Sequence, residues 1–497
     1  MRVGPLLAPT TAEPGETDEV RTARPQSHEA IGREFNIQTF LTDGHRRLVR
    51  QGEYTSPLSY PLRIDPDQRF TCASCARCCK RWEILVTNAE VESFRQHDAA
   101  RWFREHADAD EGAAFDPFEP VAGWRGYHRI RKRLDGACGF LSAANRCRIH
   151  EELGGHRKPL TCRVFPYSFH PAPDAVIVKT SFGCPTVIAN QGEPIGSGAA
   201  LQDIKSLRAA WFAGHRAADS PRVYISGRAI TADSLRILRD SLQHMLDRRQ
   251  DDGGIDLRLN VRRMAHALQD LTRARVVRLP DADFAEYIRL TLPFAAANLS
   301  APAPRPPARV GRLMARGFLY AVAATRLKLD HPAMSRVRLR VQMLRLLAHF
   351  HRLAPGFARI DLGVLRRARV DVNAPGVQPV AYRYLRASIA TLGAGTRPVL
   401  DDFAVAVSYL NAACSLAVMN AYEEKPSAFA PSAFTSASAA MDKKGLSPQE
   451  RPSVDEKIFS EALMDAVDLA HSDDRGVMGR MLARFASGVD ALDVFAR

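Results

Sequence analysis

The feature that most constrains this chain is the distribution of its cysteines. Four of them lie within eight residues, Cys72-Ala73-Ser74-Cys75-Ala76-Arg77-Cys78-Cys79, and four more follow before residue 185. The 313 residues after Cys184 contain only one more, Cys414. A C-x-x-C spacing brings two sulfurs to one side of a tight turn, where both can bind one metal ion or cluster. The clustering therefore predicts a thiolate metal site.

All eight clustered cysteines are candidate ligands of this site: Cys72, Cys75, Cys78, Cys79, Cys138, Cys147, Cys162 and Cys184. Thiolates select zinc, copper(I) or iron–sulfur clusters over hard ions such as calcium. Eight thiolates can fill two four-ligand sites, or one site with several left over, and the sequence leaves that choice open. Because adjacent side chains diverge, we expect Cys79 to point away from Cys78. Cys414, in an apolar helix, is expected to be a core residue.

The chain shows no clear export or membrane signal. Its beginning, MRVGPLLAPTTAEPGETDEV, lacks the apolar segment of a secretory signal peptide. The most apolar run, residues 403–422, is interrupted by Ser and Asn side chains, so we interpret it as a buried helix rather than a membrane span. These features predict a cytoplasmic protein, in which clustered cysteines are more often metal-binding or catalytic than disulfide-bonded. A thiol–disulfide redox centre is the main alternative, but no β-α-β pattern precedes Cys72.

With 497 residues, the chain is too long for one ordinary core. Composition and periodicity predict an α+β fold, in which a small, irregular, cysteine-rich metal-binding domain precedes a larger all-α domain. The predicted segments are a disordered tail over residues 1–34, the metal-binding domain over 35–200, a helical domain over 201–424, a flexible linker over 425–452 and C-terminal helices over 453–497.

Local patterns predict the elements around the cysteines. Lys80–Val86 is expected as a short strand or extended arm, followed by a helix over 89–104 whose N-cap is Thr87 or Asn88. Strands are expected over 127–131 and 175–178. Asp135-Gly136 is a turn signal, and it predicts a small hairpin that places Cys138 and Cys147 near one another.

The second half of the chain has helical periodicity. The expected helices are one capped by Thr231 and carrying Leu235 to Leu246, and others over 257–271, 310–329, 335–353, 384–392, 401–422, 454–471 and 475–495.

The positive charge is concentrated in one part of the chain. Residues 301–370 contain fifteen Lys or Arg and two acids, an excess of 13 that nearly accounts for the net charge of +14. Such a region suits nucleic acid, an acidic protein or an anionic membrane, but solvated helix faces explain it more simply. The sequence has no signature of sequence-specific nucleic-acid binding.

Several charged and aromatic residues lie near the cysteines. Arg77, Lys80, Arg81, Arg148 and Arg163 have an electrostatic rationale, since a four-thiolate site is strongly anionic. Trp82 is either a shield for a cluster or a local core anchor. Glu83 and Asp135 are candidate acid or base groups for which a structural role is preferred. His150, His156 and His170 are expected at the surface or as caps rather than as ligands.

The ordered set of motifs resembles a known family, the cysteine-cluster proteins with a C-x-x-C-x-x-C-C signature, described as zinc- or iron-chelating. The resemblance covers roughly residues 70–190. It is carried by these segments: Cys72 to Cys79, Trp82-Glu83-Ile84, Cys138-Gly139-Phe140-Leu141, Cys147-Arg148-Ile149-His150, Pro159 to Pro166, and Cys184.

This family includes flagellin lysine N-methylases, whose helical C-terminal half is similar to residues 229–271 here. The resemblance implies an iron–sulfur cluster (4Fe-4S) or zinc, and a protein-lysine N-methylase that transfers a methyl group from S-adenosylmethionine to a partner such as flagellin. The tight Cys72–Cys79 spacing is closer to the general cysteine-cluster proteins than to the methylases. The chain has no G-x-G-x-x-G methyl-donor loop, so any methyl donor must bind in another way. A non-catalytic metal-binding interaction module and a metal storage or delivery protein remain the alternatives.

Overall fold

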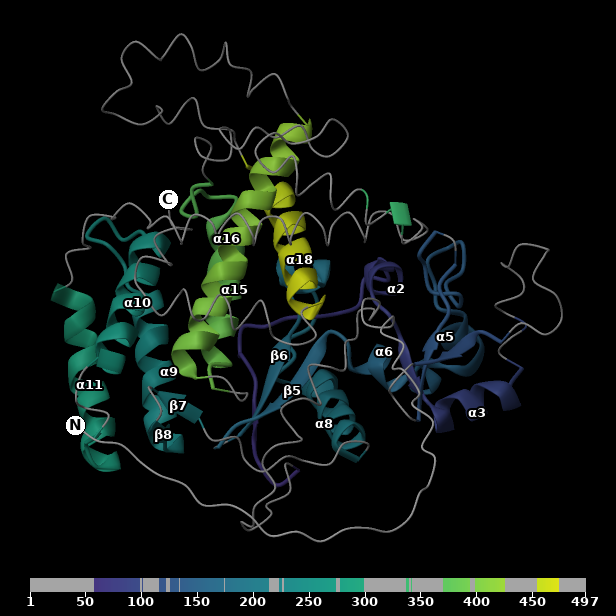
Figure 1. Cartoon of the computed structure of the whole chain (residues 1–497), viewed down its shortest axis with the longest axis horizontal. Coiled ribbons are helices and arrows are strands. Elements are labelled where there is room, and N and C mark those ends of the chain that lie inside the picture. The colour runs from purple at the N-terminus through teal and green to yellow at the C-terminus, as the bar shows by residue number, and fades with distance from the viewer. Residues whose placement is uncertain are drawn as a thin grey trace, which may run out of the picture. The chain divides into compact units, whose positions relative to one another are not determined.

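The structure is a computed structural model. It describes residues 58–98, 101, 116–121, 126–133, 135–173, 175–213, 223–225, 228–273, 278–298, 337–338, 341, 370–393, 398–424 and 454–472. The predicted tail over 1–34, the linker over 425–452, the last helix over 475–495 and nearly all of the basic region over 301–370 lie outside these residues. The fold is α+β, as predicted, with small sheets first and helices after them (Figure 1).

The first sheet joins strands far apart in the sequence, in the order β1-β6-β5. Strands β5 (Tyr167–Pro171) and β6 (Val176–Thr180) are antiparallel, with Phe169 opposite Val178. Strand β1 (Leu62–Arg63) runs parallel to β6. Helix α8 (Gly198–Ala213) contributes Ile204 and Trp211 to the apolar cluster that includes Phe169, Val176 and Val178.

The second sheet has the order β2-β4-β3 and is antiparallel throughout. Its strands are β2 (Leu85–Thr87), β4 (Tyr127–Ile130) and β3 (Phe118–Pro120). Helix α3 (Asn88–Gln96) follows β2 directly, because Thr87 and Glu90 form a capping box. The predicted end of this helix at residue 104 is wrong, since α3 ends at Gln96 and Asp98 takes a left-handed φ of 47°.

Short helices lie between the strands of these sheets and directly after the last strand. They are α2 (Arg77–Arg81), α5 (Arg148–Leu153), the 3-10 turn η1 (Gly155–Arg157), α6 (Leu160–Val164) and α7 (Pro185–Ala189). The arm predicted over Lys80–Val86 is therefore partly wrong, because Lys80 and Arg81 belong to α2. The strands predicted over 127–131 and 175–178 are confirmed within one or two residues.

The later helices share one apolar core, which we call the helical core. They are α9 (Ala232–Leu246), α10 (Leu257–Arg273), α11 (Asp281–Asn298), α15 (Gln378–Ala390), α16 (Val399–Glu424) and α18 (Glu456–Ser472). Thr231 caps α9, and the stripe that includes Leu235, Leu238 and Leu242 is buried, as predicted. Helix α15 begins six residues before the prediction, with proline in its first turn.

Two features of this region were not predicted. A two-stranded sheet, β7 (Val223–Ile225) with β8 (Arg228–Ile230), precedes α9. The helical core also extends back across residue 200 to Phe182, Cys184, Val187 and Ile188.

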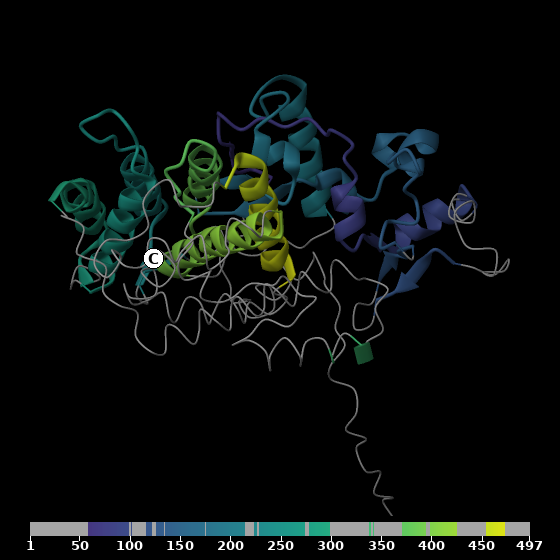
Figure 2. The same ribbon diagram turned by 90° about the horizontal axis from the view of Figure 1, so that it is seen from above.

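Helix α16 is long and apolar enough to cross a membrane by length and composition alone. In the structure, Phe403, Leu410 and Leu416 are instead buried in the helical core. Helix α18 packs along α16, and both views show the two crossing (Figures 1 and 2). This agrees with the interpretation of residues 403–422 as a buried helix.

Candidate metal centre

Two of the candidate ligands, Cys78 and Cys79, lie on α2, which is a single helical turn. Ala76 has a left-handed φ of 59° and starts this turn, which is closed by hydrogen bonds from Lys80 N to Ala76 O (3.0 Å) and from Trp82 N to Cys78 O (3.1 Å). The Cys78 and Cys79 sulfurs are 4.0 Å apart and form a weak hydrogen bond. The expectation that Cys79 points away from Cys78 is therefore wrong, because neighbours on a helix are offset by about 100° rather than opposed.

The backbone carbonyl of Cys79 connects α2 to the segment after β4. It accepts a hydrogen bond from Cys138 N (2.8 Å) and another from Lys132 Nζ (2.7 Å). Lys132 and Cys138 also form an isolated β-bridge with each other. Cys79 and Cys138 are thus held side by side although 59 residues separate them.

A further candidate ligand, Cys147, is brought to Cys138 by a tight turn. Leu141 and Cys147 form an isolated β-bridge, and Ser142 N donates a hydrogen bond to Arg146 O (2.8 Å), which closes the turn. Cys147 is the N-cap residue of α5, in which Ile149 is buried. The predicted proximity of Cys138 and Cys147 is confirmed, although isolated bridges rather than a two-stranded hairpin produce it.

The candidate ligand Cys162 lies on α6. Leu160 N donates to Glu90 Oε1 (2.7 Å) and Thr161 Oγ1 donates to Leu85 O (2.9 Å), so α6 is fixed against β2 and α3. The Trp82 and Phe165 rings pack edge to face with centroids 4.2 Å apart, which joins the ends of α2 and α6. Of the two roles considered for Trp82, this contact supports the core anchor.

Four cysteines therefore converge on one apolar cluster. We call Cys79, Cys138, Cys147 and Cys162 the thiol tetrad. They pack with the buried Ile84, Val86, Phe118, Ile130, Phe140, Leu141 and Ile149. Each pair within the tetrad is close enough to interact electrostatically. Three separate segments of the chain thus supply four soft donors to one place.

The environment distinguishes Cys79 from the other three. Burial raises the pKa of Cys138 to about 12, and burial also raises the pKa values of Cys147 and Cys162. The pKa of Cys79 is instead lowered to about 7, because the Cys78 thiol donates a hydrogen bond to it and Lys132 and Lys158 lie nearby. The pKa of Cys78 is raised, chiefly because Cys78 is the donor in that hydrogen bond.

The four sulfurs of the tetrad suit a thiophilic metal, but they are too far apart to hold one as they stand. Soft sulfur donors in an apolar cluster, with two lysines beside them, match the chemistry of zinc and iron sites. Within the described ranges, however, no three His, Cys, Asp or Glu side chains lie close enough together to hold an ion as they stand. Binding of one metal by all four thiols would therefore require the sulfurs to move closer together.

The other four predicted ligands form two pairs. Cys72 and Cys75 are exposed, whereas Cys184 is buried in the helical core at the start of α7. Cys72 interacts electrostatically with Cys78, and Cys75 interacts with Cys184. Cys414 packs against the helical core, and burial raises its pKa to about 12, in agreement with its prediction as a core residue.

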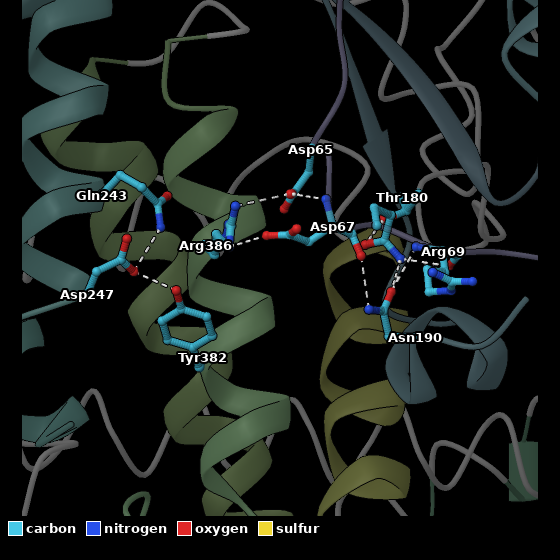
Figure 3. A network of polar contacts seen from close by, with 10 residues as sticks. Asp65, Asp67, Arg69, Thr180, Asn190, Gln243, Asp247, Tyr382 and Arg386 are labelled. Carbon is cyan, nitrogen blue, oxygen red and sulfur yellow. Dashed lines mark hydrogen bonds and ion pairs between the residues drawn. The ribbon is translucent and has the colours of Figure 1, made fainter. Parts of the chain in front are cut away.

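The chain that leads into Cys72 is fixed by a polar network (Figure 3). Asn190 Oδ1 accepts hydrogen bonds from Arg69 N (2.8 Å) and Gln68 Nε2 (3.1 Å), and Gln68 Oε1 accepts one from Thr180 (3.0 Å). Figure 3 also shows Arg386 of α15 reaching the carboxylates of Asp65 and Asp67, with the closer contact to Asp67 at 2.6 Å. This network connects the approach to the cysteines with the helices.

Most of the other predicted site residues have structural partners. Glu83 pairs with Arg129 (3.4 Å) and Asp135 with Arg133 (2.6 Å), as their preferred structural role implied. His170 Nε2 contacts Ser168 Oγ (2.8 Å).

Among the predicted cations, Lys80 interacts with Cys79, but Arg77 pairs with Asp465 (3.0 Å) and Arg148 with Glu152 (3.8 Å). The cations that face the tetrad, Lys132 and Lys158, were missed. Lys158 precedes the Pro159-Leu160-Thr161-Cys162 motif directly, which was an available signal, whereas no sequence pattern indicated Lys132.

Comparison with known proteins gives one match. Residues 71–185 match the CxxCxxCC family model, described as "Putative zinc- or iron-chelating domain". The match begins one residue before Cys72 and ends one residue after Cys184, so it contains all eight candidate ligands. No curated protein and no solved structure matches the chain.

Proposed function

We propose that this chain binds zinc or iron through the thiol tetrad. The observation that carries the proposal is the convergence of Cys79, Cys138, Cys147 and Cys162 from three separate segments into one apolar cluster beside two lysines. The match of residues 71–185 to a zinc- or iron-chelating domain supports the same chemistry. Four thiolates are the common ligand set of structural zinc and of iron–sulfur clusters.

The four thiols of the tetrad differ in how readily they ionise, and this difference sets the order in which they become available to a metal. Cys79 ionises most readily, so it is the first sulfur available to a metal. Cys138, Cys147 and Cys162 must lose protons against the cost of burial, so metal binding releases protons and strengthens as pH rises. A bound zinc ion would cross-link the three segments, and a bound [4Fe-4S] cluster would carry an electron.

The remaining candidate ligands form a second part of the proposal. Cys72, Cys75, Cys78 and Cys184 form the two pairs described above, and we propose them either as ligands of a second thiolate site or as ligands that replace members of the tetrad at the first. Two metal equivalents per chain would favour a second site, and one equivalent would favour exchange.

The test is metal analysis with a visible spectrum on anaerobically purified protein. Iron, labile sulfide and broad brown absorption would identify a cluster, and colourless protein with stoichiometric zinc would identify a zinc site. The paired variant Cys79→Ser, Cys162→Ser should lose the metal, and Cys414→Ser, in the helical core, should keep it. Wild-type protein that holds neither metal would overturn the proposal.

The resemblance to lysine N-methylases supports a narrower proposal, methyl transfer from S-adenosylmethionine to lysine on a protein such as flagellin, in the cytoplasm. Its support is sequence resemblance alone. Calorimetry with S-adenosylmethionine tests it, because a methylase should give a heat of binding. A non-catalytic metal module should give none, and a storage or delivery protein should release its metal readily to a chelator.

A further inference from the structure

Lys132 occupies a constrained position beside the tetrad. Its ammonium group donates a hydrogen bond to Cys79 O (2.7 Å), and the backbones of Lys132 and Cys138 form an isolated β-bridge. The side chain also interacts electrostatically with Cys79, Cys138 and Cys162. A half-buried lysine in this place cannot move its charge away from the sulfurs without breaking the hydrogen bond that joins α2 to the segment after β4.

Lys158 lies near the tetrad in a different segment, between η1 and α6. It is half-buried, and it interacts electrostatically with Cys162, Cys147, Cys72 and Cys79. Together the two lysines face all four members of the tetrad. Within the part of the chain that the structure describes, the exposed Lys80 and the half-buried Glu83 also interact with these residues, and Glu83 already pairs with Arg129.

The charges of the four thiolates and the two lysines determine which total charge a bound metal ion or cluster must have to suit the site. Four thiolates carry four negative charges, and two ammonium groups offset two of them, so a core with two positive charges makes the group neutral. Zinc(II) and an oxidised [4Fe-4S] cluster both have that charge, whereas copper(I) leaves one uncompensated negative charge. An uncompensated charge in an apolar cluster is strongly disfavoured.

We propose that Lys132 and Lys158 are built-in counter-cations that position the thiol tetrad and set it to accept a metal core of charge +2. The inference rests on the proposed function, since it assigns the charge balance and metal selectivity of that same site. It predicts that the affinity for zinc depends on the positive charge at both positions rather than on side-chain length.

The experiment measures the zinc affinity of the full-length protein by competition with a chromophoric chelator. The variants Lys132→Met and Lys158→Met remove one charge each at nearly constant length. Lys132→Arg and Lys158→Arg retain the charge. Lys205→Met makes the same change at an exposed position on α8 and serves as the matched control.

We expect each methionine variant to bind zinc about tenfold more weakly, since one charge near the thiolates is lost. The arginine variants should stay within about threefold of wild type, and Lys205→Met should be unchanged. The loss should be at least as large for copper(I), because the copper-loaded tetrad is one charge more negative than the zinc-loaded tetrad. If Lys132→Met fails to fold, the Lys158 pair carries the same comparison.

The outcomes separate the two claims. Wild-type zinc binding with unchanged affinity in both methionine variants would overturn the lysine assignment and leave the tetrad standing. Equal weakening by methionine and arginine would show a packing role and would also overturn the assignment. Failure of the wild-type protein to bind zinc or iron at all would overturn the proposed function, and the lysine assignment with it.

Discussion

At the scale of single residues, the unusual group is the Cys78–Cys79 pair. Its sulfurs are 4.0 Å apart, and the pKa of Cys79 is about 7 against an ordinary 9.0. A lowered pKa means that the folded protein favours the thiolate. The ionised Cys79 therefore stabilises the fold fully above about pH 9, and this stabilisation is lost as pH falls through 7.

This asymmetry predicts the effect of Cys78→Ala in metal-free protein. Without the donated hydrogen bond, the pKa of Cys79 should rise from about 7 toward 9.0. Ultraviolet thiolate absorbance against pH, with Cys79→Ser subtracted, measures that midpoint. A midpoint near 9 already in the wild-type protein would show that the Cys78–Cys79 hydrogen bond does not act as described.

A glycine shows how closely the chain approaches itself before the cysteines. Gly192 has a φ of 104°, and a Cβ there would lie 2.7 Å from the Phe70 carbonyl carbon and still closer to the Thr71 amide nitrogen. Phe70 N donates to Glu193 O (2.9 Å) across the same contact. The residue next to Cys72 therefore packs directly on a backbone that only glycine permits.

We predict that Gly192→Ala destabilises the protein by about 3 kcal/mol, because the steric clash adds to the cost of a positive φ. Gly253→Ala is the matched control: its φ is 81° and nothing lies within 4 Å of the added carbon, so about 1 kcal/mol is expected. Urea unfolding measures both free energies. Equal losses would contradict the close approach at Thr71.

At the scale of elements, the carboxylate of Glu90 accepts hydrogen bonds at the starts of two helices. Glu90 Oε2 accepts from Thr87 N (2.8 Å) and Thr87 Oγ1 (3.0 Å), which caps α3, while Glu90 Oε1 accepts from Leu160 N (2.7 Å) at the start of α6. Pro159, the N-cap of α6, offers no side-chain cap of its own. The helix that carries Cys162 therefore depends on a residue 70 positions earlier.

We predict that Glu90→Gln lowers the free energy of unfolding by about 1–2 kcal/mol, because a charge-assisted acceptor at two helix starts is weakened. Glu92→Gln, exposed on the same helix, should change it by less than about 0.5 kcal/mol. Denaturant unfolding of the metal-free proteins tests this. The same small change in both variants would show that Glu90 does not support α6.

At the scale of the whole molecule, the last described helix reaches the cysteine motif. Arg77 lies between Cys75 and Cys78, and its guanidinium pairs with Asp465 of α18 at 3.0 Å. Both side chains are largely buried, with 19% and 16% of their surface exposed. Helix α18 also packs along α16, so the cysteine turn is tied to the central helices of the helical core.

Loss of this ion pair should loosen the cysteine turn. In Asp465→Asn we expect faster hydrogen exchange over residues 72–81 and a stability loss of about 1–3 kcal/mol, since the largely buried Arg77 guanidinium loses its ion pair with Asp465. Glu461→Gln, exposed one turn earlier on α18, is the control and should match wild type. Unchanged exchange in Asp465→Asn would show that α18 does not restrain the turn.

The sequence predicted the parts of the molecule whose signal is local. Periodic leucines and the Thr231 cap predicted α9, and β-rich runs predicted β4 and β6. The clustering of cysteines predicted the segment that matches the chelating family.

Features that depend on contacts between residues far apart in the sequence could not be predicted from local patterns. The tetrad was not separable from the other four cysteines, because its selection follows from the packing of three segments around Phe140 and Ile149. The role of Lys132 depends on the Cys79 carbonyl, 53 residues away, and Glu90 and Asp465 likewise act on elements distant in sequence. No local pattern marks such pairs.

The most direct measurement is X-ray absorption at the zinc edge of the zinc-loaded protein, which counts the sulfur ligands of the bound ion. We predict four sulfurs, at about 2.3 Å. The Cys162→Ser variant should show three sulfurs or lose the metal, and Cys414→Ser should retain four. A metal bound mainly by oxygen or nitrogen, or four sulfurs retained in Cys162→Ser, would contradict the assignment of the thiol tetrad.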